Sequence, residues 1–81
     1  MVHIHFIWTE GPDGNIAHLA DNNVTPEEAE EVLREPTYRT SSRSSGRPIA
    51  FGFTSAGRQL AVVYEIIDAA TVLPVTAYDV D

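Results

Sequence analysis

Arginine side chains concentrated in one part of the chain are suited to binding phosphate. Arg39, Arg43 and Arg47 lie within residues 37–47, and Arg58 lies between two expected strands. A guanidinium group can hold a phosphate with two parallel hydrogen bonds, and it stays charged at every physiological pH. The plainer interpretation is that these arginines pair with carboxylates or keep the surface hydrated.

Four other side chains can move a proton or bind a nucleotide. His18 can act as a general acid or base because its ordinary pKa is about 6.5. Glu65 can act as a base if it lies close to the arginines. Tyr64 and Tyr78, on the last two expected strands, can donate to phosphate or stack on a base. Each also has a structural interpretation: an exposed or backbone-bonded histidine, a solvated glutamate, and tyrosines of the core.

Two histidines near the N-terminus form a weaker metal-binding pattern. His3 and His5 project from the same side of an expected strand, and two imidazoles can bind Zn²⁺ or Ni²⁺ together with a third ligand. The sequence identifies no third ligand, and the chain has no cysteine to supply a thiolate. We therefore expect neither a metal centre nor a cofactor.

Hydrophobic periodicity predicts the elements that must position these side chains. Strands are expected at residues 2–8, 48–54, 59–66 and 71–78. A short helix is expected to begin at Asn15 as its N-cap and to end at Asn22-Asn23. Residues 37–47 have four serines and no aliphatic residue, so a flexible loop is predicted there.

The segment Thr25-Pro26-Glu27-Glu28 is the clearest local signal in the chain. Thr25 is expected to cap a helix, Pro26 to occupy its first position, and Glu28 to complete a capping box. Pro36 is expected to stop this helix. Its remaining glutamates are interpreted as a solvated face or as a surface that attracts a basic partner.

These elements predict an α+β fold with the order β-α-α-β-β-β. A single domain spans residues 1–81, with a small, mostly antiparallel sheet and two helices packed on one of its faces. The strand at 59–66 is apolar on both sides and is expected to be central. Pro74 predicts an edge position or a bulge in the last strand. The neighbour of the first strand stays undetermined.

The charge of the chain is unevenly distributed. It has 12 acidic and 5 basic residues, for a net charge of −7, which argues against a protein that coats nucleic acid by bulk charge. Residues 34–58 nevertheless contain all five arginines and one acid, a local net charge of +4. No stretch is apolar enough for a membrane span and no signal peptide is evident, so a cytoplasmic location is expected.

Several segments resemble a known family when they are taken in order and with their spacing. They are Phe6-Ile7-Trp8, Asn15 through Leu19, Val24 through Val32, Gly52 through Tyr64, and Val75 through Tyr78. Together they run over almost the whole chain and resemble the BrnT-like branch of the RelE/ParE toxin superfamily. The resemblance implies a RelE-like fold and the toxin component of a type II toxin–antitoxin system. It also implies a cognate antitoxin, often a ribbon-helix-helix DNA-binding protein, with which the toxin represses its own operon.

With RNA as the substrate that the resemblance implies, the candidate residues acquire roles. Attack by the 2′-hydroxyl needs a base, an acid for the leaving 5′-oxygen and a cation for the extra phosphate charge. The candidate catalytic residues are His18, Arg47, Arg58, Glu65 and Tyr78. The candidate RNA-binding residues are Arg39, Arg43, Arg47 and Tyr64.

A second hypothesis keeps the same fold without the activity. The acidic balance, together with the acidic residues at 78–81 where BrnT-like chains are basic, favours a catalytically inactive protein-binding module. Metal storage through His3 and His5 is a third hypothesis, and a homo-oligomer is compatible with each of them.

Overall fold

Five strands and two helices follow one another in the computed structural model, which describes residues 3–80. The strands are β1 (His5–Phe6), β2 (Tyr38–Ser41), β3 (Pro48–Phe53), β4 (Gln59–Asp68) and β5 (Thr71–Asp79), and the helices are α1 (Asn15–Asp21) and α2 (Pro26–Arg34). The predicted α+β class is confirmed, with one strand more than the sequence pattern indicated.

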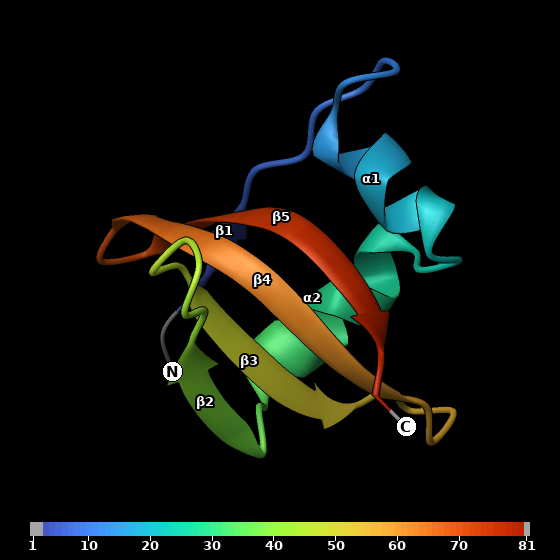
Figure 1. Ribbon diagram of the computed structural model, residues 1–81, viewed down its shortest axis with the longest axis vertical. Helices are drawn as coiled ribbons and strands as arrows, with labels where there is room; N and C mark the ends of the chain where they lie inside the picture. The colour runs from blue at the N-terminus through green and yellow to red at the C-terminus, as the bar shows by residue number, and fades with distance from the viewer. Residues whose placement is uncertain (1–2, 81) are drawn as a thin grey trace.

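The strands form one mixed sheet in the order β1-β5-β4-β3-β2 (Figure 1). β1 pairs in parallel with β5, and every other neighbouring pair is antiparallel. β4 is central, as its two apolar faces predicted. The neighbour of the first strand is β5, a pairing that no local pattern indicates.

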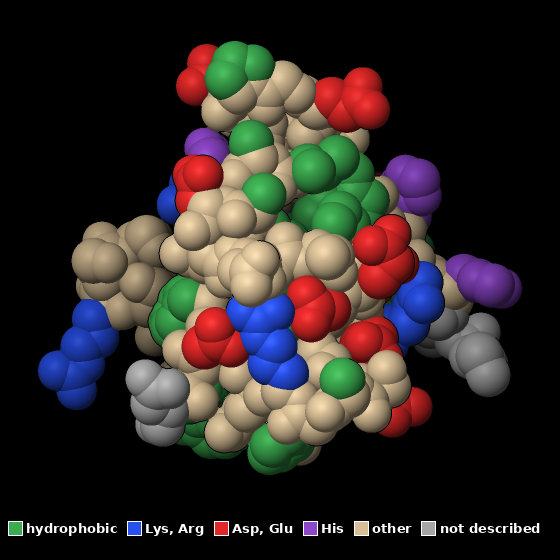
Figure 2. Space-filling view, turned by 90° about the vertical axis from the view of Figure 1, so that its right-hand side faces the viewer, with side chains coloured by type: hydrophobic (Ala, Val, Ile, Leu, Met, Phe, Trp, Pro, Cys, Tyr) green, Lys and Arg blue, Asp and Glu red, His purple; other side chains and the backbone are tan. Residues whose placement is uncertain are grey.

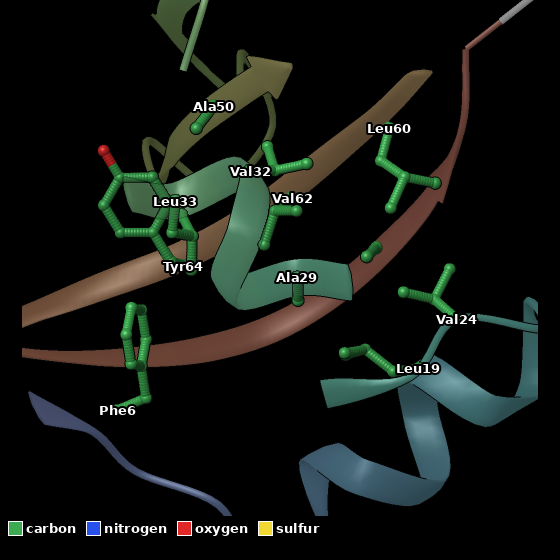
Figure 3. Packing of buried hydrophobic residues seen from close by; sticks show 11 residues of the cluster. Phe6, Leu19, Val24, Ala29, Val32, Leu33, Ala50, Leu60, Val62 and Tyr64 are labelled. Atoms are coloured by element: carbon green, nitrogen blue, oxygen red, sulfur yellow. The ribbon is translucent and has the colours of Figure 1, made fainter. Parts of the chain in front are cut away.

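Both helices cover the same face of the sheet. α1 contacts β5, whereas α2 contacts β3 and β4 and lies behind the sheet in Figure 1. Side chains from α2 and β4 meet between helix and sheet (Figure 3), among them Val32, Leu33, Leu60 and Val62. Removing these apolar side chains from water stabilises the fold. Within residues 3–80, no helix covers the opposite face of the sheet.

Helix α2 begins as predicted. The Thr25 side chain accepts a hydrogen bond from the Glu28 amide (3.2 Å), and the Glu28 carboxylate accepts one from the Thr25 amide (3.0 Å). Pro26 occupies the first helical turn, where its missing amide hydrogen costs nothing. The reciprocal capping box is therefore confirmed.

The glutamates of α2 do more than face solvent. Glu30 accepts a hydrogen bond of 2.7 Å from the indole nitrogen of Trp8, and Glu31 accepts one of 3.0 Å from the backbone amide of Ser55. These carboxylates tie the helix to the N-terminal segment and to the β3–β4 turn. The interpretation of this face as merely solvated is therefore wrong for Glu30 and Glu31.

The flexible loop predicted at residues 37–47 is wrong, because a β-hairpin occupies most of this segment. Residues 38–41 form β2, which pairs antiparallel with β3, and the Ser42 amide donates to the Arg47 carbonyl (2.7 Å) across the turn. Gly46 takes a φ of +73° there. All four β2 residues are exposed, so this edge strand lacks the apolar alternation by which strands are recognised in a sequence.

Two further expectations concern β1 and β5. The strand expected at 2–8 is only two residues long in the described chain, and its expected start at residue 2 lies outside the described residues. Pro74 lies at a register shift between β4 and β5, opposite Tyr64. The bulge that Pro74 predicted is thus confirmed.

Candidate functional site

A shallow depression of about 280 Å³ lies between α1 and the end of the β2–β3 hairpin. His18 and Asp13 line it from the α1 side, and Arg47 and Glu65 line it from the sheet. β5 contributes residues 73–75. Three of the five sequence-predicted catalytic side chains, His18, Arg47 and Glu65, therefore share one depression.

Arg47 and Glu65 form an ion pair within this depression. The Arg47 Nε donates to the Glu65 Oε1 at 3.0 Å, and the two side chains are 43% and 40% exposed. Exposed ion pairs contribute little to stability because water screens them. Both groups therefore remain accessible to a ligand, and a phosphate can compete with the carboxylate for the guanidinium.

His18 is exposed on α1, and the start of that helix is held by Asn15. Asn15 was expected to be the N-cap, but Gly14 is the N-cap and Asn15 is the first helical residue. The buried Asn15 amide nitrogen donates to the carbonyl oxygens of Ile7 and Pro74, both at 2.8 Å, and its oxygen accepts from the Thr9 amide at 2.8 Å. These bonds anchor α1 against β5 and so set where His18 lies.

Arg58 lies outside the depression, in a network at the other end of β5. Its guanidinium donates to both carboxylate oxygens of Asp79 (2.6 and 2.9 Å), to Glu28 (3.2 Å) and to the backbone carbonyl of Asn23 (2.7 Å). Figure 2, which views the molecule from the side of the β5 end, shows arginine and carboxylate side chains lying against one another. In this position Arg58 ties α2 and the α1–α2 turn to β5.

The electrostatics of this network follow from its hydrogen bonds. The bonds to Asp79 are the main cause that raises the pKa of Arg58, and the same bonds lower the pKa of Asp79. The pKa of Glu28 is lowered first by the Thr25 amide and then by Arg58. All three groups are thus held in their charged forms.

The residues expected to bind RNA do not gather in one place. Arg39 and Tyr64 line a separate depression of about 180 Å³ that Leu33 of α2 also lines. Tyr64 is only 6% exposed and belongs to the hydrophobic core, so its ring faces are not available to a base. Arg43 lies exposed in the hairpin turn, and Arg47 lies beside Glu65.

The uncovered face of the sheet carries Tyr78, a predicted catalytic residue, beside three aromatic residues that the sequence did not assign to a site. Cross-strand register places Phe51 opposite both Tyr38 and Ala61, and Ala61 opposite Tyr78. Phe53 lies on the same face by alternation. Tyr38, Phe53 and Tyr78 are 62%, 53% and 41% exposed. The sequence signal that could have identified this face is the alternation within residues 48–54. The helices cover the side of β3 that carries the small residues Ala50 and Gly52, so Phe51 and Phe53 lie on the uncovered side.

Other expectations were tested within residues 3–80. No group of three or more His, Asp or Glu side chains gathers there where it could hold a metal ion. His5 lies in β1, and His3 precedes that strand. No helix in the described part of the chain is long and apolar enough to cross a membrane.

Comparisons with known proteins add nothing to these observations. No family model, curated protein or solved structure matches the chain.

Proposed function

We propose that this protein is the toxin component of a type II toxin–antitoxin system, a BrnT-like endoribonuclease with a RelE-like fold that cleaves RNA without a metal. The observation that carries the proposal is the shared depression of His18, Arg47 and Glu65. His18 is the acid, Glu65 the base and Arg47 the cation that such a cleavage requires. The cognate antitoxin, for which a ribbon-helix-helix protein is the proposed type, binds and neutralises the toxin in the cytoplasm.

The proposed reaction assigns one step to each side chain. Glu65 takes the proton of the ribose 2′-hydroxyl, whose oxygen attacks the adjacent phosphorus. Arg47 turns from Glu65 to the phosphate and stabilises the charge that develops there. The bond from phosphorus to the 5′-oxygen breaks, and His18 gives that oxygen its proton. The products are a 2′,3′-cyclic phosphate and a 5′-hydroxyl end.

Arg58 and Tyr78 are not part of the proposed catalytic centre. The Arg58 guanidinium is occupied by Asp79, Glu28 and the backbone of the α1–α2 turn. Tyr78 lies on the uncovered face of the sheet, opposite Ala61, rather than in the depression. The proposed centre therefore consists of His18, Arg47 and Glu65.

The test is growth and RNA cleavage after induced expression in a host that lacks the antitoxin. Wild-type protein is expected to arrest growth and to generate new RNA ends with 5′-hydroxyl groups. His18→Ala and Glu65→Gln are expected to slow cleavage about 10²–10⁴-fold. His3→Ala and Glu27→Gln, at exposed positions outside the depression, are the matched controls. Full toxicity of both His18→Ala and Glu65→Gln would refute the assignment.

The second candidate is a catalytically inactive protein-binding module on the same fold. The net charge of −7 favours it, because an acidic body repels a long polyanion. It predicts harmless overexpression, no new RNA ends and a stoichiometric protein partner in the native host. Cleavage that depends on His18 and Glu65 would exclude it.

A further inference from the structure

The uncovered face of the sheet presents flat aromatic rings to solvent. Tyr38, Phe53 and Tyr78 come from β2, β3 and β5, and all are exposed. The Tyr38 ring lies against that of Phe51, with 5.8 Å between the ring centroids. The other large exposed apolar side chains of residues 3–80, Ile66 and Ile67, lie near the β4–β5 turn. The large exposed side chains on this stretch of the face are thus aromatic rather than aliphatic.

The charges on this face differ from those of the whole chain. By cross-strand register Glu65 lies on it, opposite Leu73, and its carboxylate is neutralised by Arg47. Asp79 lies opposite the buried Leu60, on the helix side, where it binds Arg58. The acids of α2 lie on that side too, and of these Glu31 lines a depression together with Glu35, Arg34 and Phe53. Apart from this depression beside Phe53, the aromatic face lacks the negative surplus that the net charge of −7 suggests.

The aromatic face lies on the same side of the sheet as Arg47 and Glu65 of the depression proposed as the cleavage site. Arg47 directly precedes β3, which carries Phe51 and Phe53 further along, and Glu65 lies on β4 two residues beyond Val63, the partner of Ile49. Arg43 lies exposed in the turn of the same hairpin. If a phosphate of an RNA strand binds Arg47, the neighbouring nucleotides of that strand would lie against the uncovered face of the sheet.

We infer that this face binds single-stranded RNA by stacking its bases on Phe53, Tyr78 and Tyr38. The inference rests on the proposed function and deepens it, because it names the form of RNA and the side chains that hold it. Every base has an aromatic face, so stacking tolerates many sequences. It requires unpaired bases, since those of a duplex are already stacked. With few cations nearby, stacking rather than phosphate contacts would supply most of the affinity.

The test measures binding separately from cleavage. The probe is a short 2′-O-methyl oligoribonucleotide that contains 2-aminopurine, whose fluorescence is quenched on stacking and whose blocked 2′-oxygen cannot attack. Wild-type protein is expected to quench the probe, and Phe53→Leu and Tyr78→Leu each to bind it about tenfold more weakly. Phe53→Trp keeps an aromatic ring and is expected to bind as wild type does. Ile66→Ala, at a position that is 65% exposed, is the control and is expected to change nothing.

The outcomes separate this inference from the ribonuclease proposal. If Phe53→Leu and Tyr78→Leu bind the probe as tightly as wild type, or if a duplex binds equally well, the inference is overturned, whatever the cleavage assay shows. If the probe is quenched but the unmodified oligonucleotide stays intact, the ribonuclease proposal fails and the stacking surface stands. If the probe does not bind and Phe53→Leu instead dissociates a dimer or a protein complex, the face is a protein interface and the inference is wrong.

Discussion

The side-chain amide of Asn15 donates a hydrogen bond of 2.8 Å to the carbonyl oxygen of Pro74, beyond the point where β1 runs beside β5. The pairing of β1 with β5 ends at Phe6 and Val72. The carbonyl of Pro74 therefore lacks a strand neighbour on that side and bonds to a side chain instead. The same side-chain amide donates to the carbonyl oxygen of Ile7 and accepts from the backbone amide of Thr9. One buried residue thus joins the N-terminal segment, α1 and β5.

Asn15→Ala is expected to destabilise the protein. The substitution leaves buried backbone groups without partners, and each such group costs about 1–3 kcal/mol. Asn22→Ala is the matched control, since Asn22 is exposed and its side chain makes a single hydrogen bond, of 2.9 Å, to the carbonyl of Ala77. Asn22→Ala is expected to lower the free energy of unfolding by about 1 kcal/mol. Urea denaturation measures both values, and equal losses would contradict the central role of Asn15.

Gly14→Ala is expected to be more disruptive than Gly52→Ala. A Cβ atom at Gly14 would overlap the carbonyl oxygen of Thr9 and lie 2.8 Å from that of Glu10, both of them backbone atoms. Overpacking of this kind costs about 1–3 kcal/mol. At Gly52 the nearest atom is a methyl carbon of Val32, at 3.2 Å, which can shift. Thermal unfolding of both variants gives the comparison, and a lower melting temperature for Gly52→Ala would reverse it.

Stability is expected to fall in acid through the Arg58 network. The pKa values of Glu28 and Asp79 are lowered in the folded protein from their ordinary values of 4.5 and 3.8. Their contribution is therefore complete above these ordinary values and is lost as the pH falls through the lowered ones. Unfolding measured from neutral to strongly acidic pH should show a decline that becomes shallower in Asp79→Asn.

The control for this pH profile is Asp21→Asn, which removes a negative charge from an exposed position at the end of α1. It is expected to keep the acid decline of the wild type. Identical profiles for Asp79→Asn and the wild type would show that the pairing with Arg58 does not underlie the decline.

RNA cleavage is expected to survive removal of divalent metal ions. In the proposed mechanism, Arg47 supplies the positive charge at the phosphate, while Glu65 and His18 transfer the protons. Cleavage by purified protein is measured before and after treatment with excess EDTA, and the rate should stay within about twofold. A loss of cleavage that added Mg²⁺ or Mn²⁺ restores would contradict the metal-free mechanism.

Local signals in the sequence predicted the elements whose cause is local. The capping box at Thr25 and Glu28 forms between residues three apart, and the two apolar faces of residues 59–66 predicted the central strand β4. Pro74 predicted a bulge because proline has no amide hydrogen to donate to a ladder. The α+β class follows from these elements and their apolar faces.

Two features, the strand β2 and the position of the Asn15 side chain, could not be predicted from local signals. Both depend on contacts with distant parts of the chain. β2 is exposed throughout and forms because β3 offers it a hydrogen-bonding edge. Asn15 has the residue type of an N-cap, yet its side chain is buried and donates hydrogen bonds to the carbonyl oxygens of Ile7 and Pro74. Neither partner can be identified from the residues next to it.

The candidate site divides in the same manner. The sequence by itself determined which side chains can transfer protons or bind phosphate, because that depends on residue type alone. Only the tertiary structure decided that His18 shares a depression with Arg47 and Glu65, while Arg58 is bound by Asp79 and Tyr64 is buried. The physical reason is that these relationships depend on strand order, register and the face that the helices cover, all of which are set by contacts between residues distant in the chain.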